Sequence, residues 1–433
     1  MNEPQKRAVT IFTILLTLAP VPFIVHYPNS SNLHLIALYY SAVIGYMGVV
    51  LLLWMYILGT RSVTGMLYTD IAPVLSIHKW LGKYATPMIF LHPILITYSK
   101  GQEWFYSLVP KTGTLIDRHI LLGQISIAIL ALTWFVSAYL REKIGFRPWK
   151  YLHYLAYISV PFALLHIPDL GSQEQAYILV KAYLLLLGII FIIFTFIRVR
   201  SLLNIDRVQY VISSNVQLTD IDRQLVVRPL NAPLKDPMHG QFVYIKLGYL
   251  SEDHPFSVTS FDPETQEIVL TYRAAGMYTR ELAKLTADSI VYMSGPFGTF
   301  TEDLTLNHTK PVVYITGGIG ITPFVSRIVA EAELREQWLF AANRNKATAV
   351  LSTTLKNLLK DRHIAIYNRE NGPLGDHEES GYITAAMLTK YLQDPTRYKF
   401  YLCGPVPMMN AVRDELAILG VKKKDIHSEK FGW

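Results

Sequence analysis

The sequence predicts a multidomain fold: a six-helix α-helical transmembrane bundle over residues 1–200, an antiparallel β-barrel domain over 201–308 and an α/β domain with a parallel sheet over 309–433. Composition gives the first reason, because 51% of the 433 residues are hydrophobic and only 17% are charged, whereas about 25% of residues are charged in soluble proteins. The second reason is a change of pattern near residue 200. There, long apolar runs give way to short alternating strands and then to strands that alternate with helices.

The excess of positive charge lies in the apolar part of the chain. Residues 1–200 contain 15 Lys and Arg against 7 Asp and Glu, and the remaining 233 residues contain 25 against 26. A net charge of +7 with this distribution excludes a nucleic-acid partner and makes the lipid bilayer the expected one. The single cysteine, Cys403, excludes intrachain disulfides, four-cysteine iron–sulfur clusters and C-x-x-C-H haem attachment.

Residues 8–60 contain no charged side chain and are too many for one membrane helix, which needs about 20 residues. A polar stretch at 26–32 divides them. Lys and Arg cluster at alternate ends of the apolar runs, which places both termini in the cytoplasm and the chain, as a multi-pass protein, in the cell membrane. The hydropathy pattern predicts six spans, at 8–26, 34–58, 77–98, 119–140, 151–168 and 176–197.

Four of the 13 histidines lie inside two predicted helices, where histidine is costly and usually functional. His78 and His92 are 14 positions apart on the third helix, and His153 and His166 are 13 apart on the fifth. A rise of about 1.5 Å per residue separates the two histidines of each helix by roughly 20 Å. Each helix thus carries one histidine per leaflet. This arrangement accommodates two stacked b-type haems, each with one axial nitrogen from each helix.

The helical period raises one difficulty. At about 100° per residue, 14 steps return nearly to the same helix face, but 13 steps leave His153 and His166 some 140° apart. Pro161 between them, and Pro87 on the third helix, would change the local register. The same histidines would also serve as interhelical hydrogen-bonding or proton-relay groups, an alternative that the residues alone leave open.

Two glycine turns indicate a nucleotide site in the α/β domain. The first, Gly317-Gly318-Ile319-Gly320-Ile321-Thr322-Pro323, follows the strand at 311–316 and opens a helix, where backbone N–H groups can approach a pyrophosphate. The second, Cys403-Gly404-Pro405, follows the strand at 399–402. Ligands of parallel sheets gather at the carboxyl ends of the strands, so both turns are predicted to form one site. The alternative is that the first glycine segment is only a structural turn between a strand and a helix.

Polar motifs also follow the strands of the barrel. His254-Pro255-Phe256-Ser257 comes first. It is followed by Arg273, whose guanidinium suits a phosphate, and then by Gly276 and Thr279, which offer close backbone approach and a hydroxyl group. The alternative is that Arg273 is a solvated strand residue.

Together, these segments resemble the ferredoxin-reductase type of flavin module fused to a ferric-reductase-like haem membrane domain, the architecture of NADPH oxidases and transmembrane ferric reductases. The resemblance covers nearly the whole chain and includes the spacings of the four histidines. It implies that FAD binds to the barrel, that NADPH binds to the α/β domain and that two b-type haems bind between the helices. The implied ligands of the haem irons are His78, His92, His153 and His166.

The same resemblance assigns the residues that bind the other cofactors. The implied FAD residues are His254, Pro255, Phe256, Ser257, Arg273, Gly276 and Thr279, with Phe431 or Trp433 covering the flavin ring. The implied NADPH residues are Gly317, Gly318, Gly320, Thr322, Pro323, Cys403, Gly404 and Pro405.

Arg344 bears on the choice between NADPH and NADH. It lies in Ala341-Ala342-Asn343-Arg344-Asn345, after the second predicted strand of the α/β domain, where no acidic residue is present to accept the ribose hydroxyl. Its guanidinium can pair with a 2′-phosphate, which favours NADPH. A solvent-exposed arginine is the alternative.

The family's electron path runs from cytosolic NADPH through FAD and the two haems to an outside acceptor, with no residue acting as a general acid or base. Molecular oxygen, giving superoxide, is the favoured acceptor, and ferric or cupric ion is the alternative. Oxygen-reducing animal members of the family carry an arginine on the second helix. They also carry a further histidine one helical turn beyond the third-helix histidine that binds the outer haem, which corresponds to His92 here. This chain has neither, with Ile96 four residues after His92. A proton conductor or transporter with a nucleotide-sensing domain is the alternative from another class.

Overall fold

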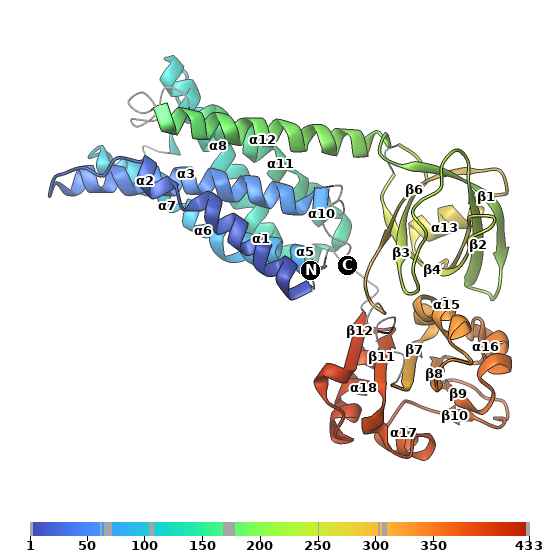
Figure 1. Cartoon of the computed structure of the whole chain (residues 1–433). Helices are drawn as coiled ribbons and strands as arrows, with labels where there is room; N and C mark the ends of the chain where they lie inside the picture. The colour runs from blue at the N-terminus through green and yellow to red at the C-terminus, as the bar shows by residue number, and fades with distance from the viewer. Residues whose placement is uncertain are drawn as a thin grey trace. The chain divides into compact units, whose positions relative to one another are not determined.

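The computed structural model describes residues 3–60, 63–64, 72–103, 108–167, 178–249, 251–301, 304 and 310–429 (Figure 1). The chain divides into two compact units, Met1–Ser201 and Leu202–Trp433. The described part of the first unit is helical, and the second unit contains a closed antiparallel barrel and a parallel sheet. The predicted fold class, helical bundle followed by barrel and α/β domain, is therefore confirmed.

Within the part of the chain that the structure describes, four helices are long and apolar enough to cross a membrane: Gln5–Ile24, Leu33–Gly59, Leu115–Ile144 and Ile178–Leu202. The third begins at a reciprocal cap, in which Thr114 and Asp117 each accept the backbone N–H of the other. The elements of these spans are α1 (Glu3–Leu18), α2 (Val21–Ile24), α3 (Leu33–Gly59), α8 (Leu115–Phe135), the π-helical turn η3 (Val136–Leu140), α9 (Arg141–Ile144) and α12 (Ile178–Leu202).

The two helices that carry the paired histidines are built from shorter pieces. Pro87 lacks the N–H that a regular helix uses, and a wide π-helical turn lies directly before its segment. The first rod consists of α5 (Ala72–Trp80), η1 (Leu81–Ala85), α6 (Thr86–Ile89) and α7 (Leu91–Ser99), and the second of α10 (Phe146–Tyr154) and α11 (Ala156–His166). The predicted spans thus correspond to four long helices and two segmented ones.

Helix packing brings the segmented rods against the long helices. α3 packs against α7, and α8 packs against α11. A buried cluster that includes Val43, Val50 and Leu53 of α3 forms the core of the bundle. In contrast, α12 exposes large apolar side chains such as Ile192 and Phe196, at 66% and 62%. Apolar side chains that face outward all along a helix are typical of a lipid-facing surface.

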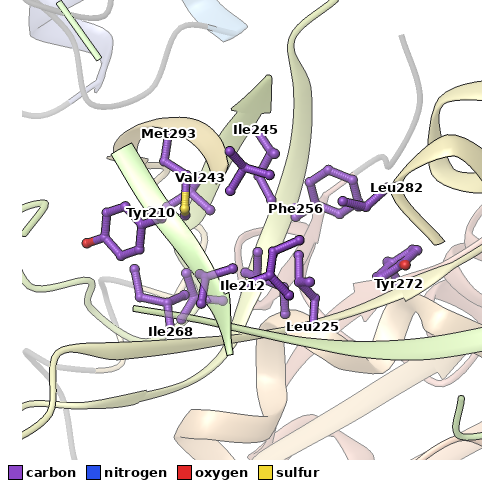
Figure 2. Close-up of a cluster of buried hydrophobic side chains, with 14 of the residues drawn as sticks. Tyr210, Ile212, Leu225, Val243, Ile245, Phe256, Ile268, Tyr272, Leu282 and Met293 are labelled. Carbon is purple, nitrogen blue, oxygen red and sulfur yellow. The ribbon is translucent and has the colours of Figure 1, made fainter. Parts of the chain in front are cut away.

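The barrel closes in the strand order β1-β2-β5-β4-β3-β6. Its side chains alternate between the inside and the outside, and the inner ones, including Tyr210, Ile212 and Leu225, form one buried cluster (Figure 2). Helix α13 (Met277–Lys284) contributes Leu282 to the same cluster. The strands are β1 (Val208–Gln217), β2 (Asp222–Pro229), β3 (Phe242–Lys246), β4 (His254–Asp262), β5 (Glu267–Arg273) and β6 (Ile290–Phe297).

The second sheet is parallel and has the strand order β10-β9-β8-β7-β11-β12. The chain order reverses between β7 and β11, so the carboxyl ends of these two strands form the topological switch point where ligands bind in such sheets. The strands are β7 (Val312–Gly317), β8 (Gln337–Asn343), β9 (His363–Tyr367), β10 (Glu378–Ser380), β11 (Lys399–Cys403) and β12 (Ile426–Glu429). The connecting α-helices are α15 (Thr322–Ala330), α16 (Ser352–Leu359), α17 (Ala385–Tyr391) and α18 (Val406–Ile418).

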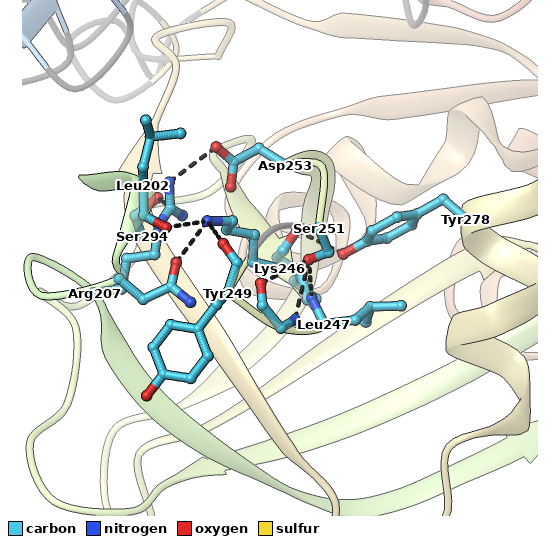
Figure 3. A network of polar contacts seen from close by, with 12 residues as sticks. Leu202, Arg207, Lys246, Leu247, Tyr249, Ser251, Asp253, Tyr278 and Ser294 are labelled. Carbon is cyan, nitrogen blue, oxygen red and sulfur yellow. Dashed lines mark hydrogen bonds and ion pairs between the residues drawn. The ribbon is translucent and has the colours of Figure 1, made fainter. Parts of the chain in front are cut away.

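A buried lysine fixes the chain where it enters the barrel (Figure 3). Lys246 of β3 is only 3% exposed. Its ammonium group donates to the Leu202 carbonyl at 3.2 Å, to Asn204 Oδ1 at 2.7 Å and to the Tyr249 carbonyl at 2.7 Å. Burial lowers the pKa of Lys246, and three oxygen acceptors satisfy its three N–H groups. The segment that follows α12 is therefore held to the barrel wall.

Candidate functional site

The structure arranges the four histidines in two facing pairs. His78 on α5 faces His153 on α10, with ring centroids 6.0 Å apart and ring planes at 83°. His92 on α7 faces His166 on α11, with centroids 6.3 Å apart and planes at 85°. All four residues are half-buried. The bundle thus contains one histidine pair at each of two levels.

A break in the fifth rod accommodates its spacing of 13 residues. Regular helix ends at Tyr154 and restarts at Ala156, and the N–H groups of Leu155 and Ile158 donate to carbonyls three residues earlier. Such 3-10 bonds overwind the chain by about 20° per residue, which reduces the angular gap expected for a regular helix. The predicted cause was Pro161, but the break lies six residues before it.

The distance between the rings fits an iron atom held between them. Metal–imidazole bonds of about 2.0 Å, with roughly 1.2 Å from ring nitrogen to ring centre, place the centroids of two trans ligands about 6.4 Å apart. The observed separations are 6.0 and 6.3 Å. Imidazole pairs that hydrogen-bonded directly to each other would lie closer together. Both pairs therefore fit bis-histidine ligation of a haem.

The Nδ1 nitrogen of each of the four rings is hydrogen-bonded. Nδ1 of His78 lies 3.0 Å from the Met55 carbonyl, and Nδ1 of His92 lies 2.9 Å from the Ser41 carbonyl. A carbonyl oxygen can only accept, so these rings carry their proton on Nδ1 and keep the Nε2 lone pair. This is the tautomer that binds a metal through Nε2, and metal-bound histidines usually donate their other ring N–H to an acceptor such as these carbonyls.

The partner rings have the same kind of contact. Nδ1 of His166 lies 2.7 Å from the carbonyl of His119, and Nδ1 of His153 lies 3.1 Å from the hydroxyl oxygen of Ser137. All four Nδ1 atoms thus have partners, and three of the rings have a main-chain carbonyl as a partner. Nδ1 of His92 also lies 3.1 Å from Ser41 Oγ. The carbonyl partners cannot be predicted from residue types, because a main-chain carbonyl has no side-chain signature.

Glycines on α3 make room for the rings of the third rod. A Cβ atom on Gly45 would lie 2.9 Å from Nδ1 of His92, and one on Gly59 would lie 3.2 Å from Cε1 of His78. Gly45 and Gly59 are 14 positions apart, the same spacing as the two histidines. Because equal spacings on two packed helices align two contacts at once, this repeat was a readable signal of the site.

Helix α8 and the turn η3 repeat this arrangement for the fifth rod. A Cβ atom on Gly123 would overlap the ring of His166. Ser137 lies 14 positions further along and contacts His153 through its hydroxyl group. Each histidine therefore faces a glycine or a serine on a neighbouring helix. Larger side chains at these positions would displace the rings.

The predicted FAD motif lies on β4, where Phe256 belongs to the buried cluster of the barrel. The His254 ring stacks on the Tyr278 ring, with centroids 3.7 Å apart and planes at 9°. Phe256 and Ser257 are buried, at 7% and 8% exposure. Burial raises the pKa of Tyr278, whose hydroxyl donates to the Ile245 carbonyl at 2.6 Å. The aromatic stack ties the motif to the first turn of α13.

Arg273 is paired with a carboxylate. Its Nε and Nη2 atoms donate to Asp222 Oδ1 and Oδ2 at 2.8 and 3.1 Å, and Asp222 is fully buried. A Cβ atom on Gly318 would lie 3.1 Å from Nη1 of Arg273. The Asp222 carboxylate therefore orients the guanidinium, with one nitrogen toward the glycine turn of the α/β domain. The Arg273 side chain is held by this ion pair and is 29% exposed.

The other predicted barrel residues form the start of α13. Gly276 precedes the helix, and its N–H donates to Thr279 Oγ1 at 3.0 Å. The Thr279 hydroxyl also bonds to the Gly276 carbonyl at 3.1 Å. Thr279 thus shapes the turn that leads from Arg273 into the helix.

The two glycine turns of the α/β domain meet at the predicted edge of the sheet. A Cβ atom on Gly320 would overlap the carbonyl of Cys403, and one on Gly404 would lie 2.8 Å from the backbone nitrogen of Gly317. Gly318 adopts φ of +55°, a conformation that glycine tolerates best. The glycines therefore allow the two backbones to touch, and the turns form one surface as predicted.

The side chains near this edge of the sheet differ in whether they are exposed enough to contact a ligand. Cys403 is fully buried in a hydrophobic cluster, and burial raises the pKa of its thiol. Thr322 is also buried, with its hydroxyl donating to the Ile319 carbonyl at 3.1 Å. These two residues can line the site through their backbone only. Pro323 is buried in the first turn of α15, Pro405 caps α18, and Arg344 is exposed just after β8.

Phe431 and Trp433, the predicted aromatic cover of the flavin, lie outside the described residues. Their assignment therefore stays a prediction.

Two family models match parts of the chain. Residues 44–164 match the ferric reductase like transmembrane component, and residues 314–414 match the oxidoreductase NAD-binding domain. The first match contains three of the four paired histidines, His78, His92 and His153, and ends before His166. The second contains both glycine turns.

Curated relatives include flavohemoproteins. The flavohemoprotein of Oceanobacillus iheyensis is 27% identical over 220 residues, which are 47% of this chain and 53% of the relative. That of Rhizobium meliloti is 27% identical over 237 residues, which are 49% of this chain and 58% of the relative. The chain therefore spans little more than half the length of these relatives.

Solved structures show similarity at lower identity. A flavohemoglobin from Malassezia yamatoensis, with bound FAD and heme, is 21% identical with a TM-score of 0.47, covering 75% of this chain and 89% of that one. The FAD/NAD binding domain of nitric oxide dioxygenase from Vibrio cholerae is 20% identical with a TM-score of 0.46, covering 52% of this chain and 99% of that one.

The matched segments follow one another in the order of the fold, with the barrel between them. The chain thus joins a segment similar to the ferric reductase like transmembrane component to a closed antiparallel barrel and then to a segment similar to the oxidoreductase NAD-binding domain.

Proposed function

We propose that this protein transfers electrons from cytosolic NADPH through FAD and two b-type haems to an acceptor on the outer face of the cell membrane. The observation that carries the proposal is the pair of facing imidazoles at each level, 6.0 and 6.3 Å apart, with Nδ1 hydrogen-bonded on the far side. Interhelical hydrogen bonding would not require this common orientation at both levels.

In this proposal His78 and His153 hold the inner haem, and His92 and His166 hold the outer haem. Bound FAD would accept electrons in pairs from NADPH and pass them on singly, which is the chemistry that the haems require. The residues of the chain position the groups. Main-chain carbonyls fix three imidazoles, and the apolar helices keep water away from the path between the two levels.

The soluble module would bring nicotinamide to flavin at the edge where β7 and β11 end. The contact between Arg273 and Gly318 supports this, because it places the guanidinium of the barrel beside the glycine turn of the α/β domain. Pyrophosphate oxygens of either cofactor would find backbone N–H groups and a fixed cation there. Exposed Arg344 lies at the end of the neighbouring strand and suits a 2′-phosphate.

We place both chain termini in the cytoplasm, with the acceptor on the other side, because Lys and Arg cluster at alternate ends of the spans. Molecular oxygen giving superoxide is the acceptor we propose, since oxygen can collect electrons at a haem edge without a docking site. Ferric or cupric ion is the second candidate, which the match to the ferric reductase like transmembrane component favours.

The haem content of the purified protein tests the proposal. The full chain in detergent is expected to contain two b-type haems per chain with bis-histidine spectra. His92→Leu is expected to leave one haem, and so is His153→Leu. His26→Gln, which changes a histidine between α2 and α3, is the matched control and should keep both.

Absence of haem from the wild type after reconstitution would contradict the proposal and leave the proton-conductor hypothesis. Superoxide formation that dismutase removes would identify oxygen as the acceptor. Slow reaction with oxygen and fast reaction with ferric citrate would instead identify a metalloreductase.

A further inference from the structure

The Nδ1 atom of His153 contacts a hydroxyl group and no main-chain carbonyl, whereas that of His92 contacts both, the Ser41 carbonyl at 2.9 Å and Ser41 Oγ at 3.1 Å. His78, His92 and His166 face main-chain carbonyls at 2.7 to 3.0 Å. His153 faces the hydroxyl oxygen of Ser137 at 3.1 Å. The inner pair is therefore asymmetric, with one carbonyl-bound ring and one hydroxyl-bound ring, whereas both rings of the outer pair have carbonyl partners.

The same serine oxygen has a second partner. Nε1 of Trp149, which is a donor only, donates to Ser137 Oγ at 3.1 Å. The Trp149 ring also stacks on the His153 ring, with centroids 5.1 Å apart and planes at 21°. The guanidinium of Arg141 lies 4.6 Å from the centre of the Trp149 ring. Trp149 is thus linked to His153 both by direct stacking and through the serine.

The position of Ser137 in the helix supports a specific role. Hydroxyl side chains within helices usually bond back to a carbonyl three or four residues earlier, as Thr10, Thr97 and Thr133 do in this bundle. Ser137 lies in the π-helical turn η3, and its hydroxyl bonds across to two side chains of α10. π-helical turns occur often at functional sites, where they redirect a side chain.

A hydroxyl shared between two donors is a weaker acceptor than a carbonyl for either of them. The strength of the Nδ1 hydrogen bond controls how strongly an imidazole donates electrons to a bound metal. A weaker acceptor makes a weaker ligand, which stabilises the oxidised iron less and raises the reduction potential.

We infer that Ser137 and Trp149 are positioning residues that set the donor strength of His153 and so give the inner haem a reduction potential distinct from that of the outer haem. The inference rests on the proposed function, because it assumes that the two pairs hold haems. Ser137 acts through its oxygen, and Trp149 acts by occupying one lone pair of that oxygen.

The test is a redox titration of the full chain in detergent, in which the outer haem of the same molecule is the internal standard. The inner transition is identified as the one that disappears in His153→Leu. Ser137→Ala removes the acceptor, and the inner potential is expected to become more positive. Ser137→Thr keeps the hydroxyl and should restore the wild-type value.

Trp149→Phe supplies the decisive comparison, because it keeps an aromatic ring beside His153 and removes only the N–H. The serine oxygen then serves His153 alone, so the inner potential should become more negative, opposite to the shift of Ser137→Ala. The outer potential should stay unchanged in all three variants. A role in packing alone would not produce shifts of opposite sign.

The inference is wrong if Trp149→Phe leaves the inner potential at the wild-type value, or if inner and outer potentials move together. If Ser137→Ala fails to retain haem, Trp149→Phe and Ser137→Thr still decide the question. Failure of the proposed function has a different signature, namely that the wild type itself binds no haem.

Discussion

His78 and His153 lie 75 positions apart in the sequence, yet their imidazole rings face each other with centroids 6.0 Å apart. Helix α3 contacts α5, α6 and α7 of the third rod and α11 of the fifth, so it packs against both rods that carry the histidine pairs. Small residues on the two long helices leave space for the rings. The site therefore depends on helix spacing as much as on the histidines.

Gly123→Ala is expected to eject the outer haem, because the added methyl group overlaps the ring of His166. Overpacking of this kind costs about 1 to 3 kcal/mol. The matched control is Gly188→Ala on α12, where the methyl group would meet no atom within 4 Å. Pyridine haemochrome assays should give one haem per chain for the first variant and two for the control. Equal haem contents would contradict the packing account.

Arg344→Ala is expected to raise the KM for NADPH about tenfold and to leave the KM for NADH unchanged, since a charge-assisted contact with phosphate is worth about 1.5 kcal/mol or more. Steady-state reduction of an artificial acceptor measures both constants. Arg397→Ala removes an exposed arginine before the amino end of β11 and should change neither. Equal effects on the two nucleotides would show that Arg344 does not read the 2′-phosphate.

Asp222→Asn is expected to lower the FAD content of the purified protein, because it weakens the paired contact that orients Arg273. Hydrogen bonds to charged groups contribute about 1.5 to 3 kcal/mol each. Glu281→Gln, which breaks an exposed ion pair with Lys284 on α13, should keep the FAD. Flavin fluorescence after gel filtration compares the two variants. Full retention of FAD in Asp222→Asn would rule out this role of Asp222.

His363 on β9 makes the α/β domain sensitive to acid. Burial lowers the pKa of His363 to about 4, whereas an unfolded histidine titrates near pH 6.5. Between these values the unfolded chain binds a proton that the folded chain does not, so the free energy of unfolding falls as the pH drops from about 6.5 toward 4. Above pH 6.5 this loss of unfolding free energy vanishes, and near pH 4 it reaches about 3 kcal/mol.

Labelling of buried Cys403 measures this dependence, because the thiol reacts only when the domain opens. The urea midpoint for labelling should fall between pH 7 and pH 5 in the wild type and fall less in His363→Leu. Comparison of both proteins at each pH removes the intrinsic pH dependence of thiol chemistry. Parallel curves would show that His363 does not cause the acid sensitivity.

The sequence predicts the histidine levels because residue type and spacing fix them before any packing is known. It also predicts that the two glycine turns meet, since parallel strands end at a common edge. It assigns the register change of the fifth rod to Pro161, whereas the chain breaks at Leu155. Proline marks where a helix can bend, but α11 continues through Pro161 without a break.

Other parts of the site could not be predicted from residue types. The Met55, Ser41 and His119 carbonyls that orient three rings have no side-chain signature. The buried side chains of Cys403 and Thr322 carry chemistry that suggests a cofactor contact, yet the fold turns both into the core. The repeat of small residues at 14-residue spacing on the long helices is, in contrast, visible in the sequence.

Anaerobic addition of NADPH to the purified, FAD-loaded full chain tests the central claim most directly. The account predicts that the absorption bands of both haems shift to the reduced form, in the wild type and in His26→Gln, and that His153→Leu, which lacks the inner haem, leaves the outer haem oxidised. Haems that stay oxidised with NADPH, while dithionite reduces them, would contradict an electron path from the nucleotide through the flavin to the histidine pairs.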